Sequence, residues 1–492
     1  MPEGNRPESP GDELRAVRVA KWEALRAQGR DPFRLTRYPR THTAAAVRQG
    51  WPGNAGESVR VAGRVTAMRL HGKIAFVDVR DESDRIQVVV RDVHPEAYAT
   101  LEWLDLGDHV GVEGLVTATR RGEISVDAAA MELLTKSFRG LPDKWAGLKD
   151  IDLRYRQRYL DLIAHPAVRD VFRLRSDTVR ALRDFLHGEG FMEVETPVLW
   201  PVAGGAEARP FVTHHNALDL TLYLRIAMEL HLKRLVVGGF ERVFEIGRVF
   251  RNEGISTRHN PEFTLLELYW AYVGYEEIMD LVERMLFHVV TRIAGRPVLE
   301  VGGRTLDFTP PYARVDFVER LQAAAGVDWF AVTTQAEALQ AARRLGIRVD
   351  PQASRVQILD KIVAETVEPD LVQPTFLVHH PVEVSPLAKR RAADPRTTER
   401  FELFCAGREL ANAFSELNDP VDQRRRFEAQ QAERARGNLD MPEWDEDFLL
   451  ALEHGLPPTG GLGVGVDRLV MLLADVPSIR DVILFPTMRP LG

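Results

Sequence analysis

The sequence predicts an α+β protein in which a small β-barrel precedes a larger domain of mixed strands and helices. Three observations indicate this class. Residues 59–135 contain five short strand-like segments in close succession. Residues 173–492 alternate helical and strand-like segments without a repeat of fixed period. The chain has 492 residues, more than one hydrophobic core normally accommodates, so two or three domains are expected.

The composition limits the class of protein further. Hydrophobic residues make up 45% and charged residues 28%, which is typical of a soluble globular protein. Cys405 is the only cysteine, which excludes an intramolecular disulfide and favours a reducing, cytoplasmic location. The sequence has no membrane-spanning apolar run, and its first residues lack signal or transit character. The net charge of −8 argues against nucleic acid covering the whole surface, but leaves room for a local basic face.

Residues 1–58 are predicted to form an N-terminal helical extension. Residues 1–10 are polar and rich in Pro and Gly, and are expected to be frayed. A helical pattern follows over residues 12–28. It has an apolar side made of Leu14, Val17, Ala20 and Leu25. It has a basic side made of Arg15, Arg18, Lys21, Arg26 and Arg30. Such a basic side is typical of a solvated helix face, and would also suit a nucleic acid if other features indicate one.

Residues 59–140 are predicted to form a barrel of the OB type. Several of the segments alternate polar and apolar residues, and turn residues such as His71-Gly72 and Arg121-Gly122 separate them. One helical interruption is expected near residues 95–101. Five strands in so short a stretch indicate a small closed barrel, although the period alone does not distinguish the OB type from another five-stranded barrel.

Residues 141–172 are predicted to be a linker that ends in a helix with a basic stretch at 154–158. The larger domain, residues 173–492, is expected to open with a helix and to carry a helical insertion at about 315–365. Its other predicted elements are helices near 173–187, 275–295, 316–325 and 334–345, and strands near 190–199, 375–380 and 401–405.

The most informative segment is residues 241–272, ERVFEIGRVFRNEGISTRHNPEFTLLELYWAY. Its flanks are strand-like, and residues 252–261 form a polar loop between them. The loop presents cationic and hydrogen-bonding side chains from Arg251, Glu253, Arg258, His259 and Asn260. A planar base could lie on the ring of Phe263 while Arg251 holds a phosphate. The alternative is an ordinary charged surface hairpin.

The strings FRNEG and RHNPEF resemble motif 2 of the class II aminoacyl-tRNA synthetases. GFMEVETPVL (190–199) resembles motif 1 of that family, and GGLGVGVDRLVML (460–472) resembles motif 3. The third string alone is weak evidence, because alternating glycines are not a dinucleotide fingerprint. The three motifs in this order are highly specific. The resemblance implies a catalytic domain built on an antiparallel sheet flanked by helices, and a homodimer that forms through motif 1.

Longer strings resemble one branch of the class, the bacterial lysyl-tRNA synthetases. These strings are AGGAEARPFVTHHNALD, LYLRIAMELHLKRLVVGGFERVFEIGRVFRNEG, ANAFSELNDP and SIRDVILFP. The resemblance implies ATP-dependent activation of L-lysine to lysyl-adenylate with release of pyrophosphate. Transfer to the 3′-terminal ribose hydroxyl of tRNA-Lys would follow. A carboxylate is already a nucleophile, so positioning and charge stabilisation are expected to dominate the first step.

The resemblance assigns an ATP site with Mg²⁺ as its cofactor. Arg251 would hold the α-phosphate and Glu253 the adenosine half, while His259 and Asn260 face the triphosphate and the base. Phe263 would stack on one side of adenine, and Arg468 would lie on the other side and reach the γ-phosphate. Two carboxylates seven residues apart would hold the metal, Glu402 and Glu409. Arg251 and Arg468 would be the catalytic residues.

The amino-acid pocket implied by the resemblance is acidic. Its substrate-facing carboxylates would be Glu229, Glu267 and Glu416, and the rest of its lining Gly205, Tyr269, Asn412 and Phe414. A cationic side chain requires a buried carboxylate and the α-ammonium requires another, whereas an aspartate-specific relative would need cationic groups here.

The barrel is expected to bind the anticodon, because unpaired bases stack on aromatic side chains. The residues implied are Phe76 and Gln87, with Arg69 and Glu123 as further candidates. The rest of the tRNA would need a restricted basic surface, for which the 12–30 helix and residues 154–158 are candidates. Residues 297–360 receive no role beyond that of an inserted or connecting helical segment.

Two other functions remain open at this point. One is a relative that attaches lysine to a protein, which an anticodon-type barrel argues against. The other is a non-enzymatic RNA-binding module, which the intact Arg251, Glu402, Glu409 and Arg468 argue against.

Overall fold

The computed structural model of the chain describes residues 10–141, 148–206, 208–435 and 444–490. The predicted fraying of residues 1–9 and residues 142–147 of the predicted linker lie outside them. The chain divides into two compact units, residues 1–149 and 150–492, and each is described by itself. Within the described ranges, no helix combines the length and apolar character needed to cross a membrane.

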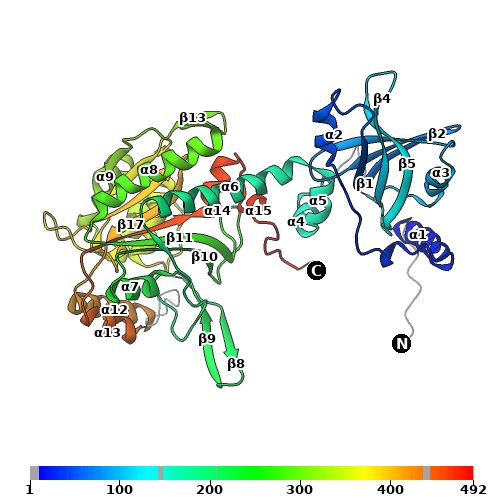
Figure 1. Cartoon of the computed structure of the whole chain (residues 1–492). Coiled ribbons are helices and arrows are strands. Elements are labelled where there is room, and N and C mark those ends of the chain that lie inside the picture. The colour runs from blue at the N-terminus through cyan, green and yellow to red at the C-terminus, as the bar shows by residue number, and fades with distance from the viewer. Residues whose placement is uncertain (1–9, 142–147, 207, 436–443, 491–492) are drawn as a thin grey trace. The chain divides into compact units, whose positions relative to one another are not determined.

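The first unit contains a closed five-stranded barrel with the strand order β1-β2-β3-β5-β4 (Figure 1). Its strands are β1 (Ser58–His71), β2 (Ile74–Arg80), β3 (Arg85–Arg91), β4 (His109–Ala118) and β5 (Ile124–Thr135). Its helices are α1 (Pro10–Ala27), α2 (Ala44–Gly50) and α3 (Pro95–Thr100). Neighbouring strands are antiparallel except for β3 and β5, which are parallel. The barrel and the helix that interrupts its strands confirm the sequence prediction.

Alternation along each strand separates the barrel core from its outer surface. On β2, Ala75, Val77 and Val79 point into the apolar core, whereas Phe76 and Asp78 lie on the outside. Because successive side chains of a strand point to opposite faces, the position of Phe76 follows from that of its neighbours. Phe76 is therefore not a core residue.

Helix α1 agrees only in part with the sequence prediction, because Leu25 is buried but the rest of the predicted apolar side is not. Arg18 and Leu25 are the buried side chains, while Leu14 and Val17, predicted to face the protein, are 40% and 58% exposed. The Arg18 guanidinium donates hydrogen bonds to the carbonyl oxygens of Ser137 and Arg139, each at 2.9 Å. A buried arginine with two carbonyl acceptors is stable, and this pairing sets the side of the helix that faces the barrel. The predicted basic side is thus partly buried.

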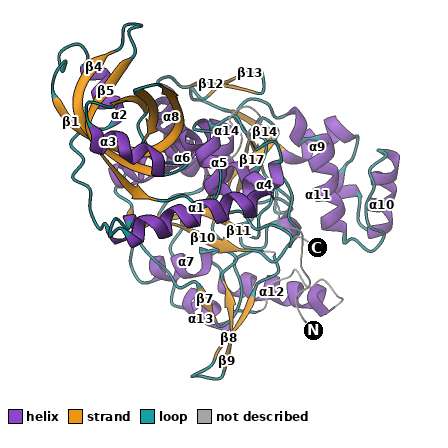
Figure 2. Cartoon of the chain, turned by 90° about the vertical axis from the view of Figure 1, so that its right-hand side faces the viewer, coloured by secondary structure: helices purple, strands orange, loops and turns teal. Residues whose placement is uncertain are grey.

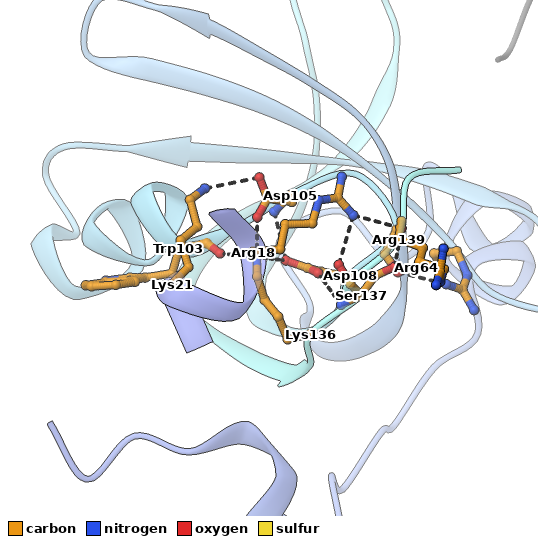
Figure 3. Close-up of polar contacts among 10 residues, drawn as sticks. Arg18, Lys21, Arg64, Trp103, Asp105, Asp108, Lys136, Ser137 and Arg139 are labelled. Atoms are coloured by element: carbon orange, nitrogen blue, oxygen red, sulfur yellow. Dashed lines mark hydrogen bonds and ion pairs between the residues drawn. The ribbon is translucent and has the colours of Figure 1, made fainter. Parts of the chain in front are cut away.

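Next to this helix lies a buried polar cluster (Figure 3). The Lys136 ammonium is fully buried and contacts the carboxylates of Asp105 and Asp108, the latter at 2.8 Å. It also donates to the carbonyl oxygen of Trp103 at 2.6 Å. Lys21 of α1 reaches Asp105 at 3.1 Å. Burial alone would raise the pKa of Asp105, but the hydrogen bonds from Lys136 and Lys21 hold it below its usual value.

The second unit is built on an eight-stranded sheet of order β14-β15-β16-β17-β18-β11-β10-β6. Its strands are β6 (Met192–Glu193), β10 (Arg242–Phe250), β11 (Glu262–Ala271), β14 (Ala313–Asp316), β15 (Thr375–Val378), β16 (Arg400–Cys405), β17 (Arg408–Ser415) and β18 (Thr459–Gly465). Only the pairs β14–β15 and β10–β6 are parallel, so the centre of the sheet is antiparallel. Smaller sheets are formed by β7 (Leu199–Trp200), β8 (Val212–His215) and β9 (Leu220–Leu224), and by β12 (Val298–Val301) with β13 (Arg304–Asp307).

The helices cover the sheet from both sides (Figures 1 and 2). They are α4 (Ile151–Arg156), α5 (Arg158–Ala164), α6 (Ala167–Gly188), α7 (Glu229–Val237), α8 (Tyr275–Ala294), α9 (Phe317–Ala325), α10 (Gln335–Arg344), α11 (Arg355–Thr366), α12 (Pro420–Ala435), α13 (Glu446–Glu453), α14 (Val466–Leu473) and α15 (Ile479–Val482). Helices α6, α8 and α14 share the main apolar core with one face of the sheet. Helices α7 and α13 pack with β10 and β11 in a separate core. The α+β class predicted from the sequence is confirmed.

Helices α9, α10 and α11 form the predicted helical insertion and have a core of their own around the fully buried Trp329. The predicted helices near 316–325 and 334–345 correspond to α9 and α10, whereas α11 lies almost entirely within the predicted bounds of the insertion but was not named as a helix. Leu377 of β15 and Phe404 of β16 belong to this core, so the insertion is attached to one end of the sheet.

The basic stretch at 154–158 is largely neutralised within the fold. Arg158 is buried, pairs with Asp161 at 2.7 Å and donates to the carbonyl oxygens of Arg480 and Leu484. Arg154 also reaches Asp161, at 2.7 Å. The stretch therefore ties α4 and α5 to the C-terminal segment and is a poor candidate for a surface that docks tRNA.

Replacing Lys136 with Met should destabilise the barrel strongly. The change leaves Asp105 and Asp108 without their shared cation in a buried site, which typically costs about 3–5 kcal/mol. Lys21→Met is the control, because that lysine is partly exposed and its pair with Asp105 contributes about 0–1 kcal/mol. Denaturant unfolding measures both, and equal losses for the two variants would contradict the assignment of Lys136 as the central cation.

Candidate active site

A cavity of about 1290 Å³ lies on the face of the large sheet opposite helices α6, α8 and α14. Alternation along the strands explains its lining. On β11, Leu266 and Leu268 point toward the helices while Glu267 and Tyr269 point into the cavity. All the residues that the sequence predicted for ATP and amino-acid binding line it. They are Gly205, Glu229, Arg251, Glu253, His259, Asn260, Phe263, Glu267, Tyr269, Glu402, Glu409, Asn412, Phe414, Glu416 and Arg468.

One end of the cavity is built by the hairpin of β10 and β11. Arg251 follows β10 directly, and its backbone N–H donates to the carbonyl oxygen of Pro261 at 2.8 Å, which closes the base of the loop. The Arg251 guanidinium lies over the ring of Phe263, 5.2 Å from its centroid. The hairpin thus holds a cation and an aromatic face together, which suits a phosphate beside a planar base.

The loop residues of this hairpin differ in how free their side chains are. Asn260 is buried, and its amide donates to the carbonyl oxygen of Glu262 at 2.7 Å and accepts from the N–H of Thr487 at 3.3 Å. Its polar groups therefore connect the loop to the C-terminal segment. His259 is exposed and shares a 3.0 Å hydrogen bond with Ser256, and Glu253 is exposed at the cavity edge.

The acidic residues at the same end are paired with cations. Arg468, at the start of α14, donates to the Glu409 carboxylate at 2.8 Å. Glu402 on β16 pairs with Arg400 at 2.7 Å and lies 3.4 Å from the His380 ring. Burial alone would raise the pKa of Glu402, but the His380 ring and the Arg400 guanidinium hold it well below its usual value. Glu402 is therefore ionised at neutral pH.

The other end of the cavity gathers carboxylates. Glu229 begins α7, Glu267 lies on β11 and Glu416 follows β17, and all three are buried. One oxygen of Glu267 accepts from the N–H of Met228 at 3.0 Å. Its other oxygen has no hydrogen-bond partner among the described residues, and it is available to a ligand.

Strand β18 provides a floor without side chains. Gly461 lies opposite Tyr269 and Phe414, and a Cβ at Gly461 would come within 2.0 Å of a Glu416 oxygen. Gly461, whose place among alternating glycines had little meaning in isolation, therefore leaves the room that the Glu416 carboxylate occupies.

Burial raises the pKa of Glu267 to about 8, and the nearby Glu229 carboxylate acts in the same direction. The Met228 amide opposes this effect only in part. In the ligand-free protein the Glu267 carboxyl is thus mostly protonated at neutral pH, and a bound cation would favour its ionised form.

The four barrel residues predicted to contact an anticodon lie close together on the outer face of the strands, where Gln87 is buried and the other three are partly or fully exposed. Arg69 and Phe76 are paired across β1 and β2, and Gln87 is paired with Asp78 across β2 and β3. Glu123 precedes β5 and is linked to this surface through Arg85, at 2.7 Å. Phe76 is half-buried and its ring packs edge-on against that of His71. Three neighbours of these residues were not predicted from the sequence: Asp78, Arg85 and Ser125. Arg85 pairs with Asp78, and the Ser125 hydroxyl donates a hydrogen bond to Gln87 at 3.1 Å.

Comparison with known proteins identifies the family. Residues 150–489 match the model of the class II tRNA synthetases (D, K and N), which is more than half of the chain. This chain belongs to the class II tRNA synthetases. Residues 59–134 of the synthetase match the OB-fold nucleic acid binding domain.

Curated relatives cover almost the whole synthetase. The lysine–tRNA ligase of Moorella thermoacetica is 55% identical over 97% of this chain and 98% of its own. That of Pelotomaculum thermopropionicum is 52% identical over 97% and 95%, and that of Staphylococcus aureus 50% over 96% and 98%. The resemblance found in the sequence strings is thereby confirmed.

Two residues of the synthetase were missed by the sequence analysis, one that lines the cavity and one that lies behind its wall. Glu368, in the short 3-10 helix Glu368–Asp370, has a pKa raised to about 7 by burial and by the carboxylates of Glu402 and Glu409. Lys233 on α7 is fully buried and pairs with Glu229 at 2.5 Å. In sequence, a Glu and a Lys four residues apart are typical of an exposed helix, so nothing marked this pair as buried.

In the ligand-free synthetase, Glu267→Gln should increase stability more at pH 8 than at pH 5. The folded-state pKa of about 8 lies above the usual 4.5, so between these values the folded wild type binds more protons than the unfolded chain. Its free energy of unfolding therefore falls as pH rises, by up to about 1.4 kcal/mol per pH unit. The glutamine variant lacks this dependence. Unfolding curves at pH 5, 6.5 and 8 measure it, and a stability difference that is constant over this range would contradict the raised pKa.

Proposed function

We propose that this synthetase is a lysine–tRNA ligase. It activates L-lysine with ATP to lysyl-adenylate, releases pyrophosphate, and transfers the lysyl group to the 3′-terminal ribose hydroxyl of tRNA-Lys. The observation that carries the proposal is a single cavity with arginines at one end and three buried carboxylates at the other. A nucleotide and an amino acid with two ammonium groups can bind there side by side. The amino-acid carboxylate and the α-phosphate, which react, would then meet in the middle of the cavity.

The hairpin end is the proposed ATP site. Arg251 binds the α-phosphate, and the ring of Phe263 stacks on the adenine, with Arg468 on its other face reaching the γ-phosphate. Glu253 contacts the adenosine half, and His259 and Asn260 lie near the triphosphate and the base. The pairing of Arg251 with Phe263 supports this arrangement, because an aromatic ring and a guanidinium already face one another there. Fixed positive charge around the α-phosphate stabilises the charge that develops during in-line attack by the lysine carboxylate.

Glu402 and Glu409 are the proposed ligands of Mg²⁺. Their oxygens are hard ligands of the kind that Mg²⁺ prefers, and the low pKa of Glu402 keeps it ionised. No three acidic, His or Cys side chains of the described ranges form a complete metal site, so bound phosphates would supply further oxygens. When bound, the metal would neutralise phosphate charge. Arg400 and Arg468 balance the two carboxylates in its absence.

The acidic end is the proposed lysine site. Glu267, with one free buried oxygen, receives the α-ammonium, and Glu416 receives the side-chain ammonium. Glu229 adds negative charge, and Gly205, Tyr269, Asn412 and Phe414 line the space occupied by the methylene chain. A neutral side chain would leave a buried carboxylate without a partner, so such substrates are disfavoured.

The remaining proposals concern the tRNA and the quaternary structure. Residues 59–140 form the anticodon-binding domain and residues 173–492 the catalytic domain, connected by the 141–172 linker after the 1–58 extension. Phe76 and Gln87 contact anticodon bases, with Arg69 and Glu123 beside them. A homodimer forms through motif 1, which is supported by the exposed apolar side chains of Met192, Val198 and Leu199.

A screen of the twenty amino acids for amino-acid-dependent exchange of pyrophosphate into ATP tests the activity. Lysine should support exchange far above all others. Arg251→Ala should reduce the lysine-dependent rate at least about 100-fold, because it removes a preorganised cation from the reacting phosphate. Exchange measured with radiolabelled pyrophosphate gives both results.

The matched control is Arg242→Ala at the opposite end of β10. Arg242 lies over the Trp270 ring and outside the cavity, so this variant should retain exchange. Circular dichroism verifies that both variants are folded. Strong exchange with another amino acid, or full activity in the folded Arg251→Ala variant, would refute the proposed site.

Phe76→Ala should weaken tRNA charging without affecting pyrophosphate exchange. Loss of one stacked base typically costs about 1–3 kcal/mol, which corresponds to roughly a 5- to 150-fold increase in KM for tRNA. Leu106→Ala, an exposed apolar residue between α3 and β4, is the control and should leave both reactions unchanged. Aminoacylation kinetics with tRNA-Lys provide the measurement; an unaltered KM in the Phe76 variant would exclude base stacking on this ring.

A further inference from the structure

Lys233 is a buried lysine at the amino-acid end of the cavity that the proposed reaction does not use. It lies on α7, one turn after Glu229, and its side chain is completely buried. Its ammonium hydrogen-bonds to Glu229 at 2.5 Å and forms an ion pair with Glu416. Two of the three carboxylates of this end therefore share one cation that belongs to the protein.

Three aromatic rings complete the environment of this ammonium. The Lys233 nitrogen lies 5.9 Å from the ring centroid of Tyr269, 5.7 Å from that of Phe414 and 5.6 Å from that of Phe448. Desolvated cations are attracted to such ring faces. Burial alone would lower the pKa of Lys233, but Glu229 and Glu416 outweigh this effect and hold it above its usual value. The side chain therefore stays a charged ammonium.

The ion pair divides the two oxygens of Glu416. Oε2 is the oxygen that forms the ion pair with Lys233, and neither oxygen has a hydrogen-bond partner among the described residues. Oε1 is the oxygen next to Gly461, at the place where a Cβ on that glycine would come within 2.0 Å. The carboxylate thus has one oxygen paired with Lys233 and the other beside Gly461, on the floor of the cavity.

A buried ion pair of this kind is not needed for stability alone. Well-packed apolar residues often replace such pairs without loss of stability, because two charges must be taken out of water. The benefit of Lys233 is geometric, since a carboxylate held at one oxygen cannot turn to meet ligands of different lengths. The helix fixes Lys233 relative to Glu229, and Glu229 to the rest of the cavity wall.

We propose that Lys233 is a positioning residue that holds Glu416 and Glu229 in place, so that Glu416 Oε1 meets an ammonium only at the reach of the lysine side chain. This inference rests on the proposed lysine–tRNA ligase activity. Lys233 does not touch the reacting atoms. It fixes how far a substrate ammonium must reach to contact Glu416, and thereby favours lysine over diamino acids with fewer methylene groups.

Lys233→Met in the full-length synthetase tests the inference by pyrophosphate exchange with lysine and with ornithine, which is one methylene shorter. The KM for lysine should rise at least tenfold, while kcat and the KM for ATP change less than threefold. The ratio of kcat/KM for lysine to that for ornithine should fall at least tenfold, because a released Glu416 can turn toward the shorter chain. A change confined to folding would not produce this separation of constants.

Lys136→Met is the matched control, because Lys136 is also a fully buried lysine that bridges two carboxylates, but in the barrel. That variant should lose stability and keep its lysine KM and its preference for lysine over ornithine. If Lys233→Met is folded and has the wild-type lysine KM and preference, the inference is wrong. Absence of lysine-dependent exchange in the wild type would instead refute the proposed function itself.

A second comparison covers the case in which Lys233→Met does not fold. Glu229→Gln combined with Lys233→Gln replaces the helical ion pair with two neutral amides, and Glu229→Gln alone is its reference. Relative to the reference, the double variant should lose at least tenfold more preference for lysine over ornithine. Equal preference in these two variants would overturn the positioning role of Lys233.

Discussion

The whole catalytic unit depends on keeping several carboxylates out of water on one face of a sheet whose other face is apolar. The period of two in a β-strand makes this possible, because adjacent residues of β11, β16 and β17 point to opposite faces. Leu266 and Leu268 contribute to the core under α8, and Glu267 between them faces the cavity. A buried carboxylate is costly unless a cation or a hydrogen-bond donor satisfies it. Glu402 and Glu409 have arginine partners, whereas Glu267 and Glu368 have a raised pKa instead.

The carboxylates at the two ends of the cavity are paired with cations to different extents. Near the hairpin, Arg400 and Arg468 neutralise Glu402 and Glu409 one to one. At the opposite end, Lys233 is shared by Glu229 and Glu416, and Glu267 has only a backbone amide. The acidic end therefore has three carboxyl groups to one protein cation, and burial raises the pKa of both Glu267 and Glu416. This imbalance favours a cationic ligand there, whereas the balanced end is suited to phosphates that bring their own counter-ion.

Much of the fold and site could be predicted from the sequence where a local signal reports a local structure. The alternating segments of the barrel indicated its strands, and the motif strings indicated the residues that converge on the cavity. The apolar side of α1 was predicted only in part: Leu25 is buried, but so is Arg18 of the predicted basic side. Its carbonyl acceptors belong to residues more than a hundred positions away, which no helical periodicity can reveal. The basic stretch at 154–158 was predicted to be part of a tRNA-binding surface, but Arg158 is buried against the C-terminal segment, again through contacts that are distant in sequence. Lys233 and Glu368 were missed because their importance lies entirely in three-dimensional neighbours.

The protonated state of Glu267 has a thermodynamic consequence for ligand capture. Under the proposed function, an α-ammonium that arrives beside this carboxyl replaces the proton it carries, so binding and proton release are linked. Calorimetric heats of lysine binding would then include the ionisation heat of whichever buffer accepts that proton. In the ligand-free protein, the Glu267 carboxyl itself takes up and releases a proton around its pKa of about 8.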